Sequence, residues 1–374
     1  MEGHLPRKPL SGIRVIDFTS MIAGPYCTRL LADCGAEVIK IEAPGGDFIR
    51  QMPPFSDGQS MYFAHLNSGK KSVVLDLKED TDKLRAFEMI NSADVVVENN
   101  RPGVMKRIGL DYGQFASTHP NLVYCAISGF GQTGPRAADS AYAPIVHATS
   151  GFDLAQMSYQ NELTRPEKCG IFTADVMAAV YAFGAIQTAL LSRERHGGGQ
   201  FVDVALLDTM ISMLIYECQT AQSPVDQPRT LYTPTATTDG FIIVAPINQK
   251  NFVDMAQTMD HPEWVTDPRF KEVSTRRRNW DQVTNLIEGW TSKRSSRECE
   301  NVLSAGGVPC SRYQTVGEAI ADTQIVERGV MVDIDNNEGG FQIPNPPFIF
   351  ADSSVGVTPI VPELGEHNKI YLSN

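Results

Sequence analysis

Asp175 precedes a long apolar stretch, and its carboxylate is the first group in the sequence that is placed to do chemistry. Residues 176–191 hold no charge, and their apolar side chains would surround a helix instead of forming one stripe, which favours burial. Residues suited to a helix end follow this stretch: Arg193, Arg195, His196 and Gly197–Gly199. The sequence therefore predicts a buried helix with Asp175 at its amino end.

Two interpretations of Asp175 follow from this position. Aspartate is a preferred N-cap residue, because its side chain accepts hydrogen bonds from backbone N–H groups that have no helical partner, and Thr173 offers the same function. The other interpretation is a catalytic carboxylate. Caps are the commoner use of such a residue, so the residue types alone favour the structural interpretation.

Cys169 is a second candidate nucleophile, six residues before Asp175. No histidine is placed nearby in the sequence to activate its thiol, so we expect Cys169 to be a packing residue. The seven cysteines are scattered and include no CxxC pair. This favours reduced, buried thiols over disulfides or zinc ligands, and we expect no metal site.

The elements that must position these residues alternate between strand and helix in the first half of the chain. Helical candidates lie near residues 25–34 and 80–91, between β-rich runs, and this alternation predicts βαβ units in a doubly wound parallel sheet. The predicted strands are residues 13–19, 36–42, 72–77, 93–99, 122–130 and, after the apolar helix, 200–207. Ligands of such sheets bind beyond the carboxyl ends of the strands.

The loops that follow three of these strands are rich in glycine, asparagine and arginine. Glycines allow backbone amides to approach a ligand, and basic side chains nearby would suit phosphates, so a nucleotide-like ligand is one interpretation and a purely structural role is the favoured one. The basic residues concerned are Arg50, Lys70, Lys71, Arg101 and Arg107. Neither a GxGxxG after the first strand nor a GxxxxGK[ST] is present, and glycine-rich turns also serve purely structural needs.

The second half changes character near residue 222, where a polar stretch rich in Pro and Thr predicts a domain boundary. A strand near 241–247 and helices near 208–217, 249–259, 281–290 and 296–305 are expected. We place a large domain at 8–221, a linker at 222–240, a small α/β domain at 241–325 and an extended C-terminal segment, returning to the large domain, at 326–374.

The composition is that of an ordinary globular protein. The 374 residues are 42% hydrophobic, carry a net charge of -12, and show neither an apolar leader nor 18 consecutive apolar residues. Scattered basic residues in an acidic chain argue against a nucleic-acid partner. We expect a cytoplasmic protein without a membrane span.

Several strings, in order along nearly the whole chain, resemble the CaiB/BaiF family of class III CoA-transferases. They are PLSGIRVIDFTSMIAGPYCTRLLADCGAEVIKIEAPGGD (9–47), NSGKKSVVLDLK (67–78), ADVVVENNRPGVMKRIGL (93–110), LVYCAISGFGQTGP (122–135), GGGQFVDVALLD (197–208) and PELGEHN (362–368). The resemblance implies a Rossmann-like large domain, a smaller α/β domain and an interlocked homodimer. It implies coenzyme A and acyl-CoA as substrates, with no tightly bound cofactor.

The resemblance also assigns roles to residues. The family's catalytic aspartate stands about eighteen residues before the Arg of an ALLxRE-like segment, a count that runs here from Asp175 to Arg193. The expected CoA-binding residues are Asn99, Asn100 (where an aromatic is usual), Arg107, Arg50 and Lys71. The expected acyl-pocket residues are Tyr142, Ile22 and His147.

The implied chemistry suits an ionised carboxylate. Attack of Asp175 on a donor thioester would give a mixed anhydride and CoA thiolate, and the thiolate would then form an aspartyl-CoA thioester. The acceptor acid would reverse these steps and leave with CoA. Water must be excluded, and the amino end of the helix is suited to stabilise the oxyanions.

Differences from two branches of the family limit the reactions that the resemblance predicts. Formyl-CoA transferases place Gln where Ile22 stands and Glu where Ala143 stands, which weakens a formyl-CoA/oxalate assignment. The racemases carry a His-Asp pair at Tyr142 and Ala143, and two-base racemisation needs that acid and base. His147, where the family often has Gln, is expected to be packed or hydrogen-bonded, with contact to the acyl group as the alternative.

Three functions are therefore weighed. The first is CoA transfer to a small carboxylic acid, with succinyl-CoA or acetyl-CoA as the expected donor. The second is an isomerase or racemase that acts at the α-carbon of an acyl-CoA, and the third is a non-enzymatic acyl-CoA-binding subunit. The resemblance favours the first.

Overall fold

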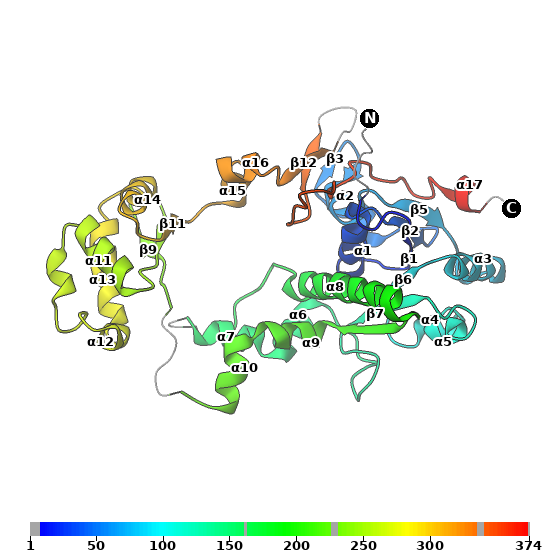
Figure 1. The fold of residues 1–374 in the computed structure, drawn as a ribbon, viewed down its shortest axis with the longest axis horizontal. Helices are drawn as coiled ribbons and strands as arrows, with labels where there is room; N and C mark the ends of the chain where they lie inside the picture. Colours follow the sequence, from blue (N-terminus) through cyan, green and yellow to red (C-terminus); the bar gives the residue numbers. More distant parts are fainter. Residues whose placement is uncertain (1–7, 161–162, 226–230, 335–339, 373–374) are drawn as a thin grey trace. The chain divides into compact units, whose positions relative to one another are not determined.

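A computed structural model describes residues 8–160, 163–225, 231–334 and 340–372 of the protein (Figure 1). The chain divides into two compact units. Unit 1 comprises residues 1–218 and 324–374, and unit 2 comprises residues 219–323. The linker expected at 222–240 includes residues 226–230, which lie outside the described residues.

Unit 1 is built on a six-stranded, wholly parallel sheet. Its order in space is β5 (Lys71–Val74), β2 (Glu37–Glu42), β1 (Arg14–Asp17), β6 (Val95–Glu98), β7 (Val123–Ser128) and β8 (Phe201–Ala205). Counted along the chain, this order is 3-2-1-4-5-6, the Rossmann arrangement. The predicted α/β fold and its six strands are confirmed for this unit.

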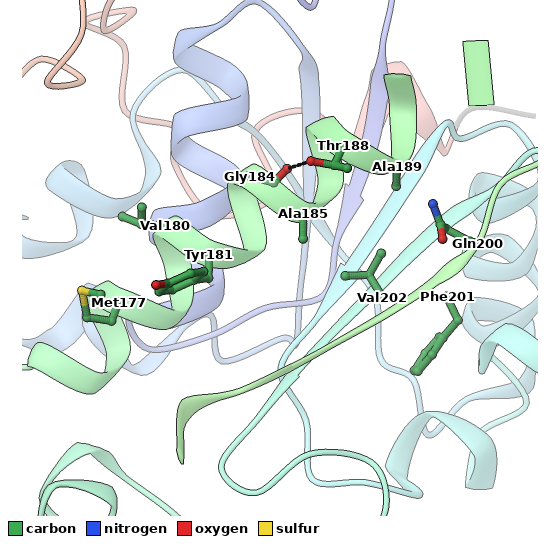
Figure 2. Close-up of a pocket in the computed structure, with 10 residues that line it drawn as sticks. All are labelled: Met177, Val180, Tyr181, Gly184, Ala185, Thr188, Ala189, Gln200, Phe201 and Val202. Atoms are coloured by element: carbon green, nitrogen blue, oxygen red, sulfur yellow. Dashed lines mark hydrogen bonds between the residues drawn. The ribbon is translucent and has the colours of Figure 1, made fainter. Parts of the chain in front are cut away.

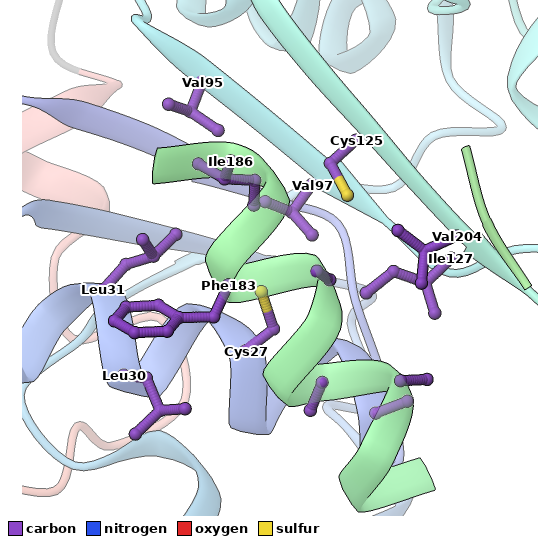
Figure 3. Packing of buried hydrophobic residues seen from close by; sticks show 14 of the residues in the cluster. Cys27, Leu30, Leu31, Val95, Val97, Cys125, Ile127, Phe183, Ile186 and Val204 are labelled. Carbon is purple, nitrogen blue, oxygen red and sulfur yellow. The ribbon is translucent and has the colours of Figure 1, made fainter. Parts of the chain in front are cut away.

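Both faces of the sheet are buried, which explains why the strands are almost continuously apolar. Val15 and Ile16, neighbours in β1, point to opposite faces and belong to different core clusters. On one face, α1 (Ala23–Asp33) and α8 (Thr173–His196) pack over Val95 and Val97 of β6 (Figure 3). On the other face, α3 (Asp80–Asn91) covers the sheet with Ala86 and Ile90.

The remaining helices of unit 1 connect these layers. They are η1 (Phe48–Gln51), α2 (Met61–Asn67), α4 (Val104–Arg107), α5 (Tyr112–Phe115), α6 (Ala143–Ser150), α7 (Phe152–Ser158) and α9 (Leu206–Met213). A two-stranded ribbon joins β3 (Phe55–Ser56) to β4 (Gln59–Ser60). One helix was expected at 208–217, but α9 and α10 (Ile215–Gln222) are separated at Leu214, whose ψ of 56° is not helical.

The apolar helix α8 is buried on one face only within a single chain, which corrects the prediction of burial all round. Its alanines, Phe183 and Ile186 contact the core, whereas Val180 and Tyr181 are 46% and 45% exposed. This helix is long and apolar enough to cross a membrane, but a core helix of a globular domain meets the same criteria. Here α8 packs against α1, α9 and β8.

The C-terminal segment belongs to unit 1. After α15 (Val316–Ile320) and α16 (Thr323–Glu327), strands β12 (Met331–Ile334) and β13 (Phe341–Pro344) form an antiparallel pair that packs on Ala64 of α2. The last helix, α17 (Asn368–Tyr371), lies beside β5, where the backbone N–H of Val74 donates to the Asn368 side chain over 2.8 Å. This segment therefore closes the edge of the sheet at β5.

Unit 2 is a smaller α/β unit. Its three-stranded antiparallel sheet has the order β11 (Cys310–Arg312), β10 (Phe241–Val244), β9 (Thr235–Ala236). Its helices are α11 (Gln249–Thr258), η2 (Pro262–Val265), α12 (Val273–Arg278), α13 (Trp280–Thr291) and α14 (Ser296–Ala305). Ile242, Phe252, Ile287 and Leu303 contribute to its separate core.

Candidate active site

The carboxylate of Asp175 lies in the first turn of α8 and does not cap the helix. The N-cap residue is Phe172, which makes no side-chain cap bond, and Asp175 is the third helical residue. None of the described residues donates a hydrogen bond to the Asp175 carboxylate, and burial raises its pKa to about 6. The cap predicted for Asp175 is therefore wrong, and its carboxylate is both desolvated and unpaired.

His147 caps α8 in its place. Its Nε2 accepts a hydrogen bond from the backbone N–H of Ala174 over 3.1 Å, and its side chain is buried in α6. An accepting Nε2 requires a neutral ring, and burial lowers the pKa of His147 in the same direction. His147 is thus a hydrogen-bonded residue that satisfies one of the unpaired donors at the amino end of α8.

An apolar cluster lies at the start of α1, where Ile22 is the N-cap residue and is buried. Ile22 packs with Ile49, Phe63 and Leu66, and the partly buried ring of Tyr62 joins them. Helix α1 packs against both α2, which carries Tyr62, and α8, which carries Asp175, and the negative charge of Asp175 contributes to raising the pKa of the Tyr62 hydroxyl. Sequence reasoning missed Tyr62, because nothing in the string that surrounds it marks a site residue.

Tyr142 occupies the N-cap position of α6, the helix that carries His147. Its side chain is 62% exposed, whereas the adjoining Ala143 is buried. An exposed aromatic ring that is held at a helix start is suited to contact a ligand. The pocket role predicted for Tyr142 stays a prediction.

Asn99 and Asn100 follow β6 at the carboxyl edge of the sheet. Asn99 accepts from the backbone N–H of Ser20 over 2.9 Å and donates to the Ser20 carbonyl over 2.8 Å, so it joins the loops after β1 and β6. The backbone N–H of Asn100 donates to Glu98, and burial raises the pKa of Glu98 to about 7. Both asparagines therefore lie where ligands of parallel sheets bind.

The expected phosphate-binding side chains differ in what they contact. Arg50 is paired with Glu42 over 2.7 Å and stacks on Phe63. Lys71 lies in β5, and its charge acts on Glu37 and His367. Arg107 is exposed in the last turn of α4, with no ion pair among the described residues. Of these three cations, Arg50 is held in an ion pair, whereas Lys71 and Arg107 have no ion pair among the described residues.

Lys70 is not available to phosphates, contrary to expectation. Its ammonium group is fully buried and donates to Asp17 over 3.0 Å and to Thr28 over 2.7 Å. Lys40 is similarly buried and paired with Asp47 over 2.9 Å. These two pairs fix the loops at the carboxyl ends of β1 and β2, and neither lysine is free to bind a ligand.

The cysteines differ in burial, whereas all were expected to be buried. All seven are free thiols, and Cys27, Cys34, Cys125 and Cys299 are buried. Cys169 is exposed, so the packing role predicted for it is wrong. The Cys169 Sγ donates to the backbone carbonyl oxygen of Ile171 over 3.3 Å.

A groove of about 770 Å³ runs along the outer face of α8 and the edge strand β8 (Figure 2). Met177, Val180 and Tyr181 of α8 and Val202 of β8 lie along it, and Gln200 is its main polar side chain. Asp175 is not among the lining residues. The groove is therefore a largely apolar surface that does not include the Asp175 carboxylate.

Comparison with known proteins places the whole chain among CoA-transferases. The model of CoA-transferase family III matches residues 10–368. Acetyl-CoA:oxalate CoA-transferase of Acetobacter aceti is 35% identical and covers 91% of this chain and 89% of its own length. Succinate--glutarate CoA-transferase of Agrobacterium fabrum is 35% identical and covers 98% of this chain and 96% of its own length.

Solved structures agree with the fold. Rv3272 of Mycobacterium tuberculosis superposes with a TM-score of 0.89 at 29% identity, covering 98% of this chain and 99% of its own. A CAIB/BAIF family protein of Brucella suis superposes with a TM-score of 0.86 at 30% identity, covering 98% of this chain and 99% of its own.

Proposed function

The chain belongs to CoA-transferase family III and is an enzyme that uses CoA thioesters, and we propose that it transfers CoA to a carboxylic acid through covalent intermediates on Asp175. The observation that supports this role is the state of that carboxylate. Asp175 is desolvated and has no hydrogen bond or ion pair among the described residues. A carboxylate without competing partners keeps its lone pairs for attack on a carbonyl carbon.

The proposed transfer proceeds through two covalent intermediates on Asp175. A carboxylate oxygen of Asp175 attacks the donor thioester, and collapse of the tetrahedral intermediate releases CoA thiolate and leaves a mixed anhydride. The thiolate attacks the Asp175 carbonyl carbon and releases the donor acid, giving aspartyl-CoA. The acceptor carboxylate then attacks aspartyl-CoA, and the released thiolate attacks the acceptor carbonyl, which restores Asp175. The amino end of α8 favours the negative charge that develops in each step.

CoA itself is proposed to bind at the carboxyl edge of the sheet. Asn99 and Asn100 lie there after β6, and the nearby Arg107 offers an unpaired charge for phosphate. Tyr142 and Ile22 are proposed to line the acyl pocket. Arg107→Ala should raise KM for acyl-CoA about tenfold with little change in kcat, because one phosphate contact is made equally in the ground and transition states.

The acids are proposed to be small, with succinyl-CoA or acetyl-CoA as the donor. Similar proteins carry the names acetyl-CoA:oxalate, succinate--glutarate and succinyl-CoA:mesaconate CoA-transferase, at 33–35% identity. These names share a small donor and a carboxylic acid acceptor but differ in the acid. Ile22 and Ala143 argue against oxalate here. A panel of acyl-CoA donors and acids, followed by product mass, identifies the pair.

A homodimer is proposed to cover the apolar groove along α8. The groove combines the exposed side chains of α8 with the free edge of β8, and both are surfaces that proteins normally cover. Val180→Glu should lower the molar mass measured by light scattering from that of a dimer to that of a monomer. Exposed Leu84→Glu on α3 is the matched control and should leave the mass unchanged.

Covalent trapping tests the proposed nucleophile. Incubation with acyl-CoA and then hydroxylamine or borohydride should modify the peptide that holds Asp175, as read by its mass. An unmodified peptide, together with turnover by Asp175→Ala, would contradict the mechanism. Deuterium exchange at the α-carbon without an acceptor acid would instead support the isomerase alternative.

A further inference from the structure

The hydroxyl of Tyr62 is a buried hydrogen-bond donor that lacks a partner among the described residues. Tyr62 is the second residue of α2, and its ring packs into the cluster formed around Ile22 and Phe63. Packing fixes the ring, so the position of the hydroxyl is set by the fold and not by a bond of its own. A buried polar group without a partner destabilises a protein, and such groups are rare enough to need an explanation.

Two carboxylates lie close enough to act on this hydroxyl. Burial first, and then the charges of Asp175 and Asp47, raise the pKa of Tyr62 to about 12. Asp47 is already engaged, because it accepts from Lys40 over 2.9 Å and from the backbone N–H of Ile49 over 3.0 Å. Asp175 has no such partner. The Tyr62 hydroxyl therefore stays protonated at neutral pH. Its helix α2 and the Asp175 helix α8 both pack on α1, and Asp175 is the one of the two carboxylates that has no partner among the described residues.

This donor makes no bond in the resting enzyme, to Asp175 or to any other described group. An interaction that is absent in the ground state but forms as charge develops lowers the barrier of the reaction by its full strength. A donor that is fixed beforehand in a water-poor site needs no reorganisation at that moment. The placement of Tyr62 has both properties.

We infer that the Tyr62 hydroxyl is a catalytic hydrogen-bond donor to the oxyanion that forms on the carboxyl carbon of Asp175 itself. This inference rests on the proposed covalent mechanism. When CoA thiolate attacks the mixed anhydride at the Asp175 carbon, the carbonyl π electrons move onto the Asp175 oxygen, and they return when the donor carboxylate leaves. The same oxygen bears the charge again when the acceptor carboxylate attacks aspartyl-CoA. Tyr62 keeps its proton throughout and only donates the hydrogen bond.

The inference divides the four additions between two sets of donors. In the other two additions, Asp175 attacks the donor thioester or thiolate attacks the acceptor acyl group. The negative charge then develops on the carbonyl oxygen of the substrate and not on that of Asp175. Loss of the Tyr62 hydroxyl should therefore slow the formation and consumption of aspartyl-CoA, and should not reduce the affinity for acyl-CoA.

Tyr62→Phe removes the hydroxyl and keeps the ring. With acyl-CoA alone, quenched-flow mass measurement of the Asp175 peptide should show aspartyl-CoA forming about 100-fold more slowly, as expected for one lost oxyanion donor. The melting temperature should stay the same or rise, since the substitution removes an unpaired buried hydroxyl. A residue that serves only the fold would show the opposite pattern, with lower stability and undiminished chemistry.

Tyr26→Phe is the matched control, because Tyr26 packs against the same cluster and its hydroxyl is not acted on by Asp175. It should form aspartyl-CoA at the wild-type rate. Aspartyl-CoA formation by Tyr62→Phe as fast as in the wild type, or slowed equally in both variants, would overturn the role of Tyr62.

The wild-type measurement separates this inference from the proposed function. If wild-type enzyme forms no aspartyl-CoA, the covalent mechanism fails and the role of Tyr62 fails with it. If wild-type enzyme forms the adduct and Tyr62→Phe forms it equally fast, the mechanism stands and only the role of Tyr62 is rejected.

Discussion

Two carboxylates of unit 1, the fully buried Asp17 at the end of β1 and the partly buried Asp175 at the start of α8, have opposite surroundings. Burial disfavours the charge of Asp17, yet Lys70, Lys40 and the nearby hydroxyls hold its pKa below the ordinary value. Asp175 has burial alone, and its pKa rises to about 6. One carboxylate is held by partners and the other is left without them.

This difference in hydrogen bonding suits Asp17 to a structural role and Asp175 to a chemical one. Asp17 accepts from Lys70, Thr19 and Thr28, so every step of a reaction at its oxygens would first break these bonds. Asp175 has no such bond among the residues that the structure describes. An unpaired buried carboxylate destabilises the fold, and proteins keep such a group where its reactivity is used.

The largest expected effect is on activity. Asp175→Asn should lower kcat about 10⁴-fold, because an amide does not form the anhydride or the aspartyl-CoA thioester. Asp17→Asn is the matched control, assayed under conditions where it is folded. Steady-state CoA transfer measures both, and turnover by Asp175→Asn near the wild-type rate would break the comparison.

The second effect is on stability and falls on the other carboxylate. Asp17→Asn should lower the free energy of unfolding by about 3–5 kcal/mol, because it leaves the ammonium group of Lys70 buried without its counter-charge. Asp175→Asn should not lower it. Urea denaturation followed by circular dichroism measures both variants, and a neutral Asp17→Asn would show that the Lys70 pair contributes nothing.

The third effect is the pH dependence of stability. The pKa of Asp175 is about 6 in the folded protein and about 4 in the unfolded chain, so between these values the native state binds more protons and stability falls as pH rises. The Asp175→Asn variant does not lose this stability as pH rises. The stability of the variant relative to wild type should therefore rise from pH 4 to 6 and then level off. A difference that is flat over this range would mean that Asp175 has an ordinary pKa.

The smallest effect concerns the cap beneath the reaction centre. His147→Phe should lower the free energy of unfolding by about 1 kcal/mol, because the backbone N–H of Ala174 loses its acceptor. His147→Gln keeps an acceptor and should recover most of this loss. Equal stability of both variants, measured by thermal unfolding, would show that the bond has no net value.

The sequence determined the local elements and their order. The valines and isoleucines of β1, β6 and β7 predict strands because each short apolar run lies between turn residues, and helix α3 occupies the predicted residues 80–91. Asp175 was found through the family strings and not through its composition, since residue types alone favoured a cap. Patterns that repeat within a few residues are local, and one sequence is enough to reveal them.

Tertiary structure decided which charges are free and which side chains meet. Lys70 reads as a phosphate ligand in the sequence but is paired with Asp17, 53 residues away. His147, 27 residues before Ala174, provides the cap that had been assigned to Asp175. Tyr62 and Asp175 lie in the same part of unit 1 because α2 and α8 both pack on α1. Pairing and desolvation depend on groups distant in sequence, so the reactivity of Asp175 is a property of the folded chain.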